Sequence, residues 1–231
     1  MLAVLSTSAG TASRHLVVDV VLHGAQQQMR RRELEPIEAR VKRLRELIEK
    51  HAGGVRGARI NFVAHLGGAP DMKAVDAVIA RITPFGWHIQ LHMDAHEVTQ
   101  YRAFLDGLKV PFIIDHMGRP EAKHGVKQAA FQQMLDLMKN PLAWTKISGP
   151  ERISSTGKPF HDAEPFVREL IAAAPDQLLW GTDFPHPNAT YMPNDGELVD
   201  LFAKFCDDEA MRKKILVDNP TRLYWPELVA A

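Results

Sequence analysis

The chain has 231 residues, 45% of them hydrophobic, so it is long enough to bury a sizeable core in a single domain. Its 28 basic and 28 acidic side chains cancel to a formal net charge of zero. This balance argues against the basic surface of a nucleic-acid-binding or membrane-surface protein, and it favours a small-molecule partner.

The single cysteine, Cys206, excludes a disulfide within the chain and a cysteine-rich metal cluster. It fits a reducing compartment, so we expect a cytoplasmic protein. No apolar run approaches the ~18 residues of a transmembrane helix, so we expect no membrane-spanning segment. Residues 1–15 lack the charged start and apolar stretch of a signal peptide, so we do not expect export.

Strand and helix patterns alternate along the chain. A candidate strand at Val17–Leu22 precedes a helix predicted from Pro36 to His51, which stops at Gly53-Gly54. Five further strands are predicted at Arg59–Phe62, His88–His92, Phe112–His116, Trp144–Ser148 and Leu178–Thr182. Amphipathic helices are predicted between them at Asp71–Ile82, Glu97–Leu108, Lys127–Met138 and Glu164–Ala174.

The five strand starts are 24 to 34 residues apart, the length of one strand–helix unit, with no linker-like break between them. The sequence therefore predicts an α/β fold with a parallel sheet, as a single domain over residues 1–231. Side chains alternate in direction along a strand, and polar residues share one face of successive strands. These residues are Arg59 and Asn61, then His88, Gln90 and His92, then Lys146 and Ser148. A closed barrel accommodates such a face better than an open sheet covered on both sides.

The most informative stretch follows the last predicted strand. It places an acid, an imidazole and an amide together at Asp183, His186 and Asn188. Pro185 and Pro187 lie between them and stiffen the segment by fixing φ. This pattern is typical of the rim of an active site. The structural alternative is that Asp183 caps a turn and the His186 ring packs on proline.

Four segments resemble the amidohydrolase-related barrel family: Gly86–His88, Val110–Pro120, Trp180–Asn188 and Asn219–Trp225. The resemblance runs over residues 57–225, whereas residues 1–56 are atypical. It implies a (β/α)8 TIM-barrel type of fold, like that of the metal-dependent hydrolases. It also implies an enzyme of aromatic-compound degradation that opens a small carboxylated cyclic ester, such as a pyrone dicarboxylate.

The resemblance also implies roles for particular residues. Asp183 would be the general base that activates water, and His116 would polarise the scissile carbonyl. The other implied site residues bind substrate: Arg59, Asn61, His88, His92, Arg152, His186 and Asn188. Guanidinium groups bind carboxylates through two hydrogen bonds, which suits Arg59 and Arg152. Lactone hydrolysis needs no cofactor, so we expect no metal.

The chain also departs from the family pattern. It contains no His-x-His, the motif that opens the first strand in this family. Too few strands are predicted for a full ring, so we expect a barrel that is open or incomplete at its N-terminal side. Its exposed sheet edges lead us to expect self-association into a homo-oligomer. His65 and His92 stand where the lactone-opening members carry an arginine and a tyrosine.

Two other functions remain open at this stage. One is a metal-dependent decarboxylase or amidohydrolase of the same fold, with zinc as its metal. The other is a catalytically impaired, truncated relative. Individual residues also have structural alternatives. In these, His116 is a core histidine, Arg152 pairs with Glu151, and Arg59 neutralises a buried acid. His88, His92 and His96 are spaced by four, and we interpret them as lining the mouth rather than binding a metal.

Overall fold

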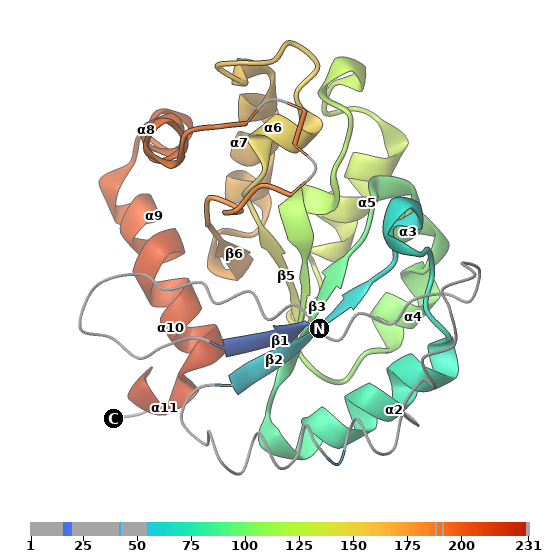
Figure 1. Cartoon of the computed structure of the whole chain (residues 1–231). Coiled ribbons are helices and arrows are strands. Elements are labelled where there is room, and N and C mark those ends of the chain that lie inside the picture. Colours follow the sequence, from blue (N-terminus) through green and yellow to red (C-terminus); the bar gives the residue numbers. More distant parts are fainter. Residues whose placement is uncertain (1–15, 20–41, 43–54, 188, 191, 230–231) are drawn as a thin grey trace. The chain divides into compact units, whose positions relative to one another are not determined.

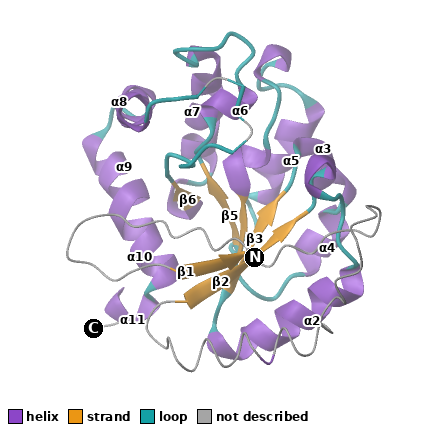
Figure 2. Cartoon of the chain, viewed as in Figure 1, coloured by secondary structure: helices purple, strands orange, loops and turns teal. Residues whose placement is uncertain are grey.

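A computed structural model describes residues 16–19, 42, 55–187, 189–190 and 192–229, and Figure 1 labels their elements. The chain divides into two compact units, Met1–His92 and Met93–Ala231. Strands and helices alternate along both units, as Figure 2 shows by colour. This alternation confirms the α/β class. The single-domain assignment stays a prediction.

The first unit is built on parallel strands. β1 (Leu16–Asp19) pairs with β2 (Val55–Asn61), and β2 pairs with β3 (His88–His92). β3 has the predicted bounds, and β1 lies within the candidate strand at Val17–Leu22 apart from its first residue. The predicted helix Pro36–His51 lies outside the described residues, except for Lys42.

The helix between β2 and β3, α2 (Met72–Ile82), begins where the sequence predicts. Asp71 caps it, because its side chain accepts a hydrogen bond from the backbone N–H of Lys73 at 3.0 Å. Ala74, Val75, Val78 and Ile82 form its buried face, at the spacing of an amphipathic helix.

The second unit contains three strands in parallel register. β4 (Phe112–Ile114) pairs with β5 (Ala143–Lys146), which pairs with β6 (Leu178–Leu179). The helices of this unit are α3 (Ala95–Gln100), α4 (Arg102–Gly107), α5 (Ala129–Leu137), α6 (Pro150–Ile153), α7 (Glu164–Ala173), α8 (Asp195–Phe205), α9 (Glu209–Lys213), α10 (Asn219–Tyr224) and α11 (Pro226–Val229).

Three predicted strands are shorter in the structure, and one of them, β5, ends at Lys146 rather than Ser148. β4 ends at Ile114 because His116 and Met117 have φ values of 50° and 59°, which no strand accommodates. β6 ends at Leu179, so Asp183 lies on the following loop. The predicted helix Glu97–Leu108 is divided into α3 and α4 at Tyr101, whose φ and ψ are −99° and 18°.

Apolar residues from strands and helices form the core of the second unit. Ile113, Trp144 and Leu179 come from β4, β5 and β6 and pack together. Leu223 and Tyr224 of α10 pack against this cluster. The C-terminal segment therefore anchors the last helices to the sheet of this unit.

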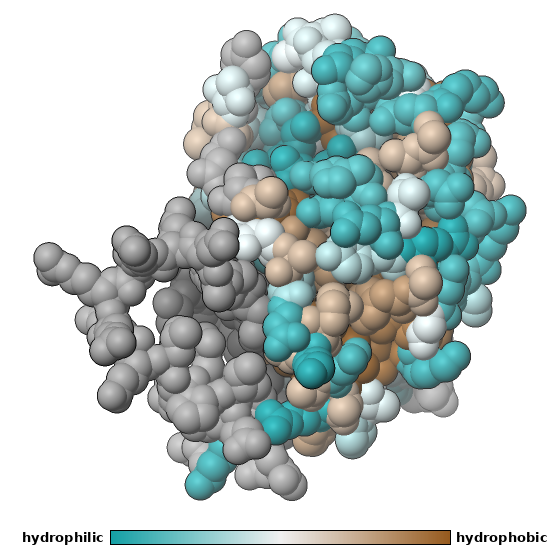
Figure 3. Space-filling model, turned by 90° about the vertical axis from the view of Figure 1, so that its right-hand side faces the viewer, coloured by the Kyte–Doolittle hydropathy of each residue, from teal (hydrophilic) through white to brown (hydrophobic). Residues whose placement is uncertain are grey.

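The described surface carries many hydrophilic side chains (Figure 3). Figure 3 shows hydrophilic side chains over most of the described surface in that view, with apolar side chains between them. Among the described residues, no helix combines the length and apolar character needed to cross a membrane.

Candidate active site

Asp183 stands on a tight turn four residues beyond β6. Its φ is 71°, and its carbonyl oxygen accepts a hydrogen bond from the backbone N–H of His186 at 2.8 Å. A left-handed φ is unusual for a residue with a side chain and is often found at functional sites. The Asp183 side chain is 19% exposed, so solvent and small ligands can reach it.

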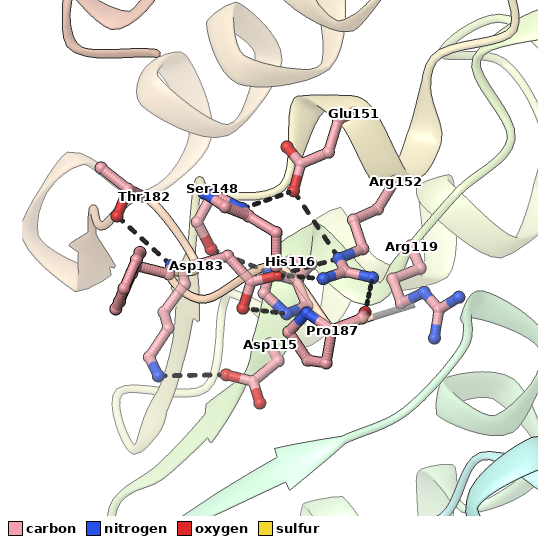
Figure 4. A network of polar contacts seen from close by, with 12 residues as sticks. Asp115, His116, Arg119, Ser148, Glu151, Arg152, Thr182, Asp183 and Pro187 are labelled. Atoms are coloured by element: carbon pink, nitrogen blue, oxygen red, sulfur yellow. Dashed lines mark hydrogen bonds and ion pairs between the residues drawn. The ribbon is translucent and has the colours of Figure 1, made fainter. Parts of the chain in front are cut away.

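His116 stands directly after β4 and faces Asp183. Its Nε2 lies 3.4 Å from Oδ1 of Asp183, and its Nδ1 lies 3.0 Å from the hydroxyl oxygen of Ser148 (Figure 4). The preceding Asp115 forms an ion pair with Lys146 instead, at 3.2 Å. Of Asp115 and His116, it is thus His116 that faces Asp183.

Burial lowers the pKa of His116 from its ordinary value of 6.5, while the charges of Asp115 and Asp183 act in the opposite direction. The ring is therefore neutral near pH 7 and has one donor and one acceptor nitrogen. When Ser148 donates to Nδ1, the proton of the ring lies on Nε2, which can then donate to a carbonyl oxygen or to Asp183.

Arg152 of α6 holds the other oxygen of the same carboxylate. Its Nε and Nη2 atoms lie 2.8 Å and 2.6 Å from Oδ2 of Asp183, and its Nη1 donates to the Pro187 carbonyl at 2.9 Å. The neighbouring Glu151 is farther away, at 3.7 Å from Nε. Asp183 is thus the nearer partner of Arg152, and Glu151 is a second one. The predicted contact of Arg152 with a substrate carboxylate stays a prediction.

Gly149 permits this arrangement at the start of α6. Its φ is 70°, and a Cβ atom there would lie 2.9 Å from Nδ1 of His116 and 3.0 Å from Cγ of Arg152. Glycine adopts such a φ without the steric cost that other residues incur. A larger residue would push His116 and Arg152 apart.

Glu151 and His186 add a buried layer behind Asp183. Their side chains are 2% and 3% exposed, and Oε1 of Glu151 lies 3.6 Å from Nδ1 of His186. The Nε2 atom of His186 lies 3.1 Å from Oδ1 of Asp195, at the first turn of α8. The sequence placed His186 at the site and named Glu151 only as an alternative partner of Arg152, because burial of a single acid leaves no pattern in the sequence.

Glu151, Asp183 and His186 offer ligand atoms within 4.8 Å of one another, so we tested whether they suit a metal ion. They do not, because Arg152 already contributes a cation there, within 4 Å of an oxygen of each carboxylate. A divalent cation between the carboxylates would be repelled by that guanidinium.

The remaining predicted site residues lie in the first unit, apart from Asn188, which is outside the described residues. Arg59 is half-buried, and His88 and His92 are buried on β3. His88 lies over Gly57 of β2, where a Cβ atom would be 2.3 Å from its Nε2. The Asn61 amide donates to the carbonyls of Val63 and Leu66, at 3.4 Å and 3.3 Å. Substrate contacts of these residues stay predictions.

Comparisons with known proteins show which family the chain resembles. The Amidohydrolase family model matches residues 20–225. Over 80% of its length, the chain is 39% identical to a 2-pyrone-4,6-dicarboxylate hydrolase of Comamonas testosteroni and also 39% identical to a 4-sulfomuconolactone hydrolase of Rhizobium radiobacter. The matches cover 64% and 63% of those two proteins, so the chain spans less than two thirds of their length.

A solved structure supports the fold. A putative 2-pyrone-4,6-dicarboxylic acid hydrolase from Pseudomonas putida superposes with a TM-score of 0.66 at 28% identity. The match covers 85% of this chain and 70% of that protein. The parallel strands and alternating helices are thus those of the TIM-barrel type that the sequence predicts.

Proposed function

Because the chain belongs to the amidohydrolase family, we propose that it hydrolyses a small lactone that bears a second anionic group. The names of the two curated relatives support this class of substrate, since one refers to a pyrone dicarboxylate and the other to a sulfonated lactone. A role in aromatic-compound degradation follows from the same names and belongs to the proposal.

The observation that carries the proposal is the contact between His116 and Asp183. An imidazole nitrogen and a carboxylate oxygen, 3.4 Å apart and brought together from two loops, can act on one bound ester. Both side chains lie at the carboxyl ends of parallel strands, or on the loops that follow them, where enzymes of this fold type bind substrate.

In the proposed reaction, Asp183 accepts a proton from a water molecule as the water attacks the lactone carbonyl. His116 donates a hydrogen bond to the carbonyl oxygen, which becomes negative as the tetrahedral intermediate forms. Collapse of the intermediate breaks the ring C–O bond, and the departing ring oxygen takes up the proton that Asp183 accepted from water. Opening the ring gives a carboxylate, so one proton is released per turnover at neutral pH.

We propose a metal-free reaction. The alternative of a zinc enzyme needs three or more ligands in close geometry. The cluster best placed to supply them already holds the Arg152 guanidinium.

The test is turnover of lactones that carry a carboxylate or sulfonate, including 2-pyrone-4,6-dicarboxylate, with ring opening followed by absorbance. We expect Asp183→Asn to lower kcat by about 10²–10⁴-fold, the usual contribution of a general base. Asp106→Asn is the matched control, because Asp106 is an exposed acid that pairs with Arg102 on α4. A folded wild-type protein that turns over none of these lactones, or an Asp183→Asn variant as active as wild type, would contradict the proposal.

A further inference from the structure

Lys146 is the last residue of β5, and it lies on the side of the strand that carries a contact to His116. The pairing of β5 with β6 continues through Ile147, whose backbone N–H donates to β6 at 2.8 Å, so side chains still alternate there. Lys146 and Ser148 therefore share one side, and the Ser148 hydroxyl contacts Nδ1 of His116 at 3.0 Å. In this type of fold, substrates bind at that end of the strands.

The ion pair of Lys146 ties it to His116 a second time. Its Nζ lies 3.2 Å from Oδ1 of Asp115, the residue that directly precedes His116. Burial is the main cause that lowers the pKa of His116, and the charge of Lys146 acts in the same direction. The ammonium group is thus within electrostatic reach of the ring that the proposed reaction uses.

The two members of this ion pair differ in burial. The Asp115 side chain is 1% exposed, whereas that of Lys146 is 24% exposed. An ammonium group has three N–H donors, and within the described part of the chain Asp115 is the one polar partner of Lys146. Lys146 can therefore hold Asp115 and still donate to a ligand that reaches the site.

Arg152, the cation bound to Asp183, has less to offer a ligand. Each of its three side-chain nitrogens already has a partner: Nε and Nη2 contact Asp183, and Nη1 donates to the Pro187 carbonyl. Its side chain is 12% exposed, half the value for Lys146. A substrate carboxylate or sulfonate therefore finds accessible donors more readily at Lys146.

We propose that Lys146 binds the second anionic group of the substrate and so determines the preference for charged over neutral lactones. This rests on the function proposed above. When the lactone carbonyl lies at His116, a carboxylate or sulfonate on the same small ring can reach the neighbouring ammonium group. The contact does not involve the reacting bond, so it stabilises bound substrate and transition state alike and contributes to KM rather than to kcat.

The test is the affinity for benzene-1,3-dicarboxylate, a flat ring with two carboxylates and no ester to hydrolyse, measured by calorimetry. Lys146→Met removes the ammonium group and keeps an unbranched side chain. We expect Kd to rise about 10- to 100-fold, the usual contribution of a hydrogen bond between charged groups. The KM of a carboxylated lactone should rise by a similar factor, with kcat and the KM of a neutral lactone nearly unchanged.

Asp115→Asn separates a binding role of Lys146 from a structural one. Lys146→Met and Asp115→Asn break the same ion pair, so a purely structural pair would make both variants bind the dicarboxylate equally poorly. If Lys146 binds the ligand, Asp115→Asn leaves its ammonium group in place and removes a nearby negative charge. The affinity of Asp115→Asn should then equal or exceed that of wild type.

Two further variants serve as controls. Lys139→Met makes the same change in an exposed lysine paired with Asp136, and it should leave the affinity unchanged. Lys146→Met alone leaves the buried Asp115 carboxylate without this cation, which is costly. If that variant does not fold, the double variant Lys146→Met/Asp115→Asn removes both charges together, and it should show the same loss of affinity.

Binding of the dicarboxylate needs no turnover, so the failure of this proposal can be told from the failure of the proposed function. A protein that opens no lactone, yet binds the dicarboxylate and loses it in Lys146→Met, would overturn the function and support the anion site at Lys146. The role of Lys146 would be overturned by a wild-type protein that does not bind the dicarboxylate, by wild-type affinity in Lys146→Met, or by equal losses in Lys146→Met and Asp115→Asn.

Discussion

At the scale of single residues, the site depends on how His116 is held. Its Nδ1 lies 3.0 Å from the buried hydroxyl of Ser148, and this contact orients the ring. Ser148→Ala should leave Nδ1 without a partner, at a cost of about 1–3 kcal/mol in the free energy of unfolding. We expect kcat to fall by about 10- to 100-fold, because small displacements of reacting groups are costly.

Urea denaturation and steady-state kinetics would measure these two effects. Ser155→Ala is a suitable control, because Ser155 is an exposed serine whose hydroxyl donates to Asp162. A Ser148→Ala variant with wild-type kcat would show that the Ser148 hydroxyl does not position His116 for catalysis.

The pH dependence of stability provides a second test at His116. Burial lowers its pKa in the folded chain below the ordinary value of 6.5 that it regains on unfolding. As the pH falls through 6.5, the unfolded chain therefore takes up the proton first, and the folded state loses stability down to the folded pKa. This single group contributes at most about 1.4 kcal/mol per pH unit.

His116→Gln should lack that contribution. We expect the stability difference between wild type and His116→Gln to shift against wild type as the pH falls from about 7 to 5, by the same linkage. Urea denaturation at several pH values would show it. A difference that is constant over this range would mean that the folded pKa of His116 is not lowered.

At the scale of elements, the first turn of α6 brings the site together. Gly149, with φ 70°, directly precedes α6, and a Cβ atom there would meet His116 and Arg152 at 2.9–3.0 Å. Gly149→Ala should destabilise the fold by about 1–2 kcal/mol through the left-handed backbone alone. The contact with His116 should add to that cost and lower kcat/KM.

Gly125→Ala is the matched control for that substitution. Gly125 has a φ of 65°, but a Cβ atom there would have no neighbour within 4 Å. Its alanine variant should show the backbone cost and keep wild-type kcat/KM. Equal losses of stability and activity in the two variants would show that the close approach of Gly149 to the site is unimportant.

The elements also show what could be predicted from the sequence. β3 and α2 were predicted almost to the residue, because alternation on β3 and the Asp71 cap on α2 are local signals. The ends of β4 and β6 were placed too late, since His116, Met117 and Asp183 adopt left-handed backbone conformations that apolar patterns do not encode.

The parts of the candidate site that lie within contiguous sequence motifs could be predicted. Asp183 and His116 lie together in one unit, as expected, whereas the ion pair between Arg152 and Asp183 was not predicted. The pairing of Arg152 with Glu151 was an alternative given by the sequence, but the contact of Glu151 with His186 was not predicted, because it depends on burial that only the folded chain creates.

At the scale of the whole molecule, the C-terminal helices stabilise the second unit through one buried side chain. The Asn219 amide at the start of α10 donates to the carbonyls of Pro175 and Leu178, at 2.8 Å and 2.9 Å. Asn219→Ala leaves the buried Leu178 carbonyl and the part-buried Pro175 carbonyl without this donor. We expect the free energy of unfolding to fall by about 1–3 kcal/mol, measured by urea denaturation, with kcat nearly unchanged.

Asn140→Ala tests whether burial is the cause. Asn140 is half-buried, and its side chain accepts one hydrogen bond, from the backbone N–H of Leu142 at 2.9 Å. Its loss should cost about 1 kcal/mol or less. If both variants lose the same stability, the Asn219 contacts do not anchor α10 in the way proposed.

Charge balance predicts how whole molecules interact. The chain has a formal net charge of zero and an isoelectric point near 7.2, so molecules do not repel one another near neutral pH. A protein with net charge near zero tends to associate, and a net charge suppresses association. We expect sedimentation velocity at low salt to show larger species near pH 7 than at about pH 9, where the chain is negative. A sharply monomeric boundary at both pH values and at high concentration would contradict this expectation, and with it the predicted homo-oligomer.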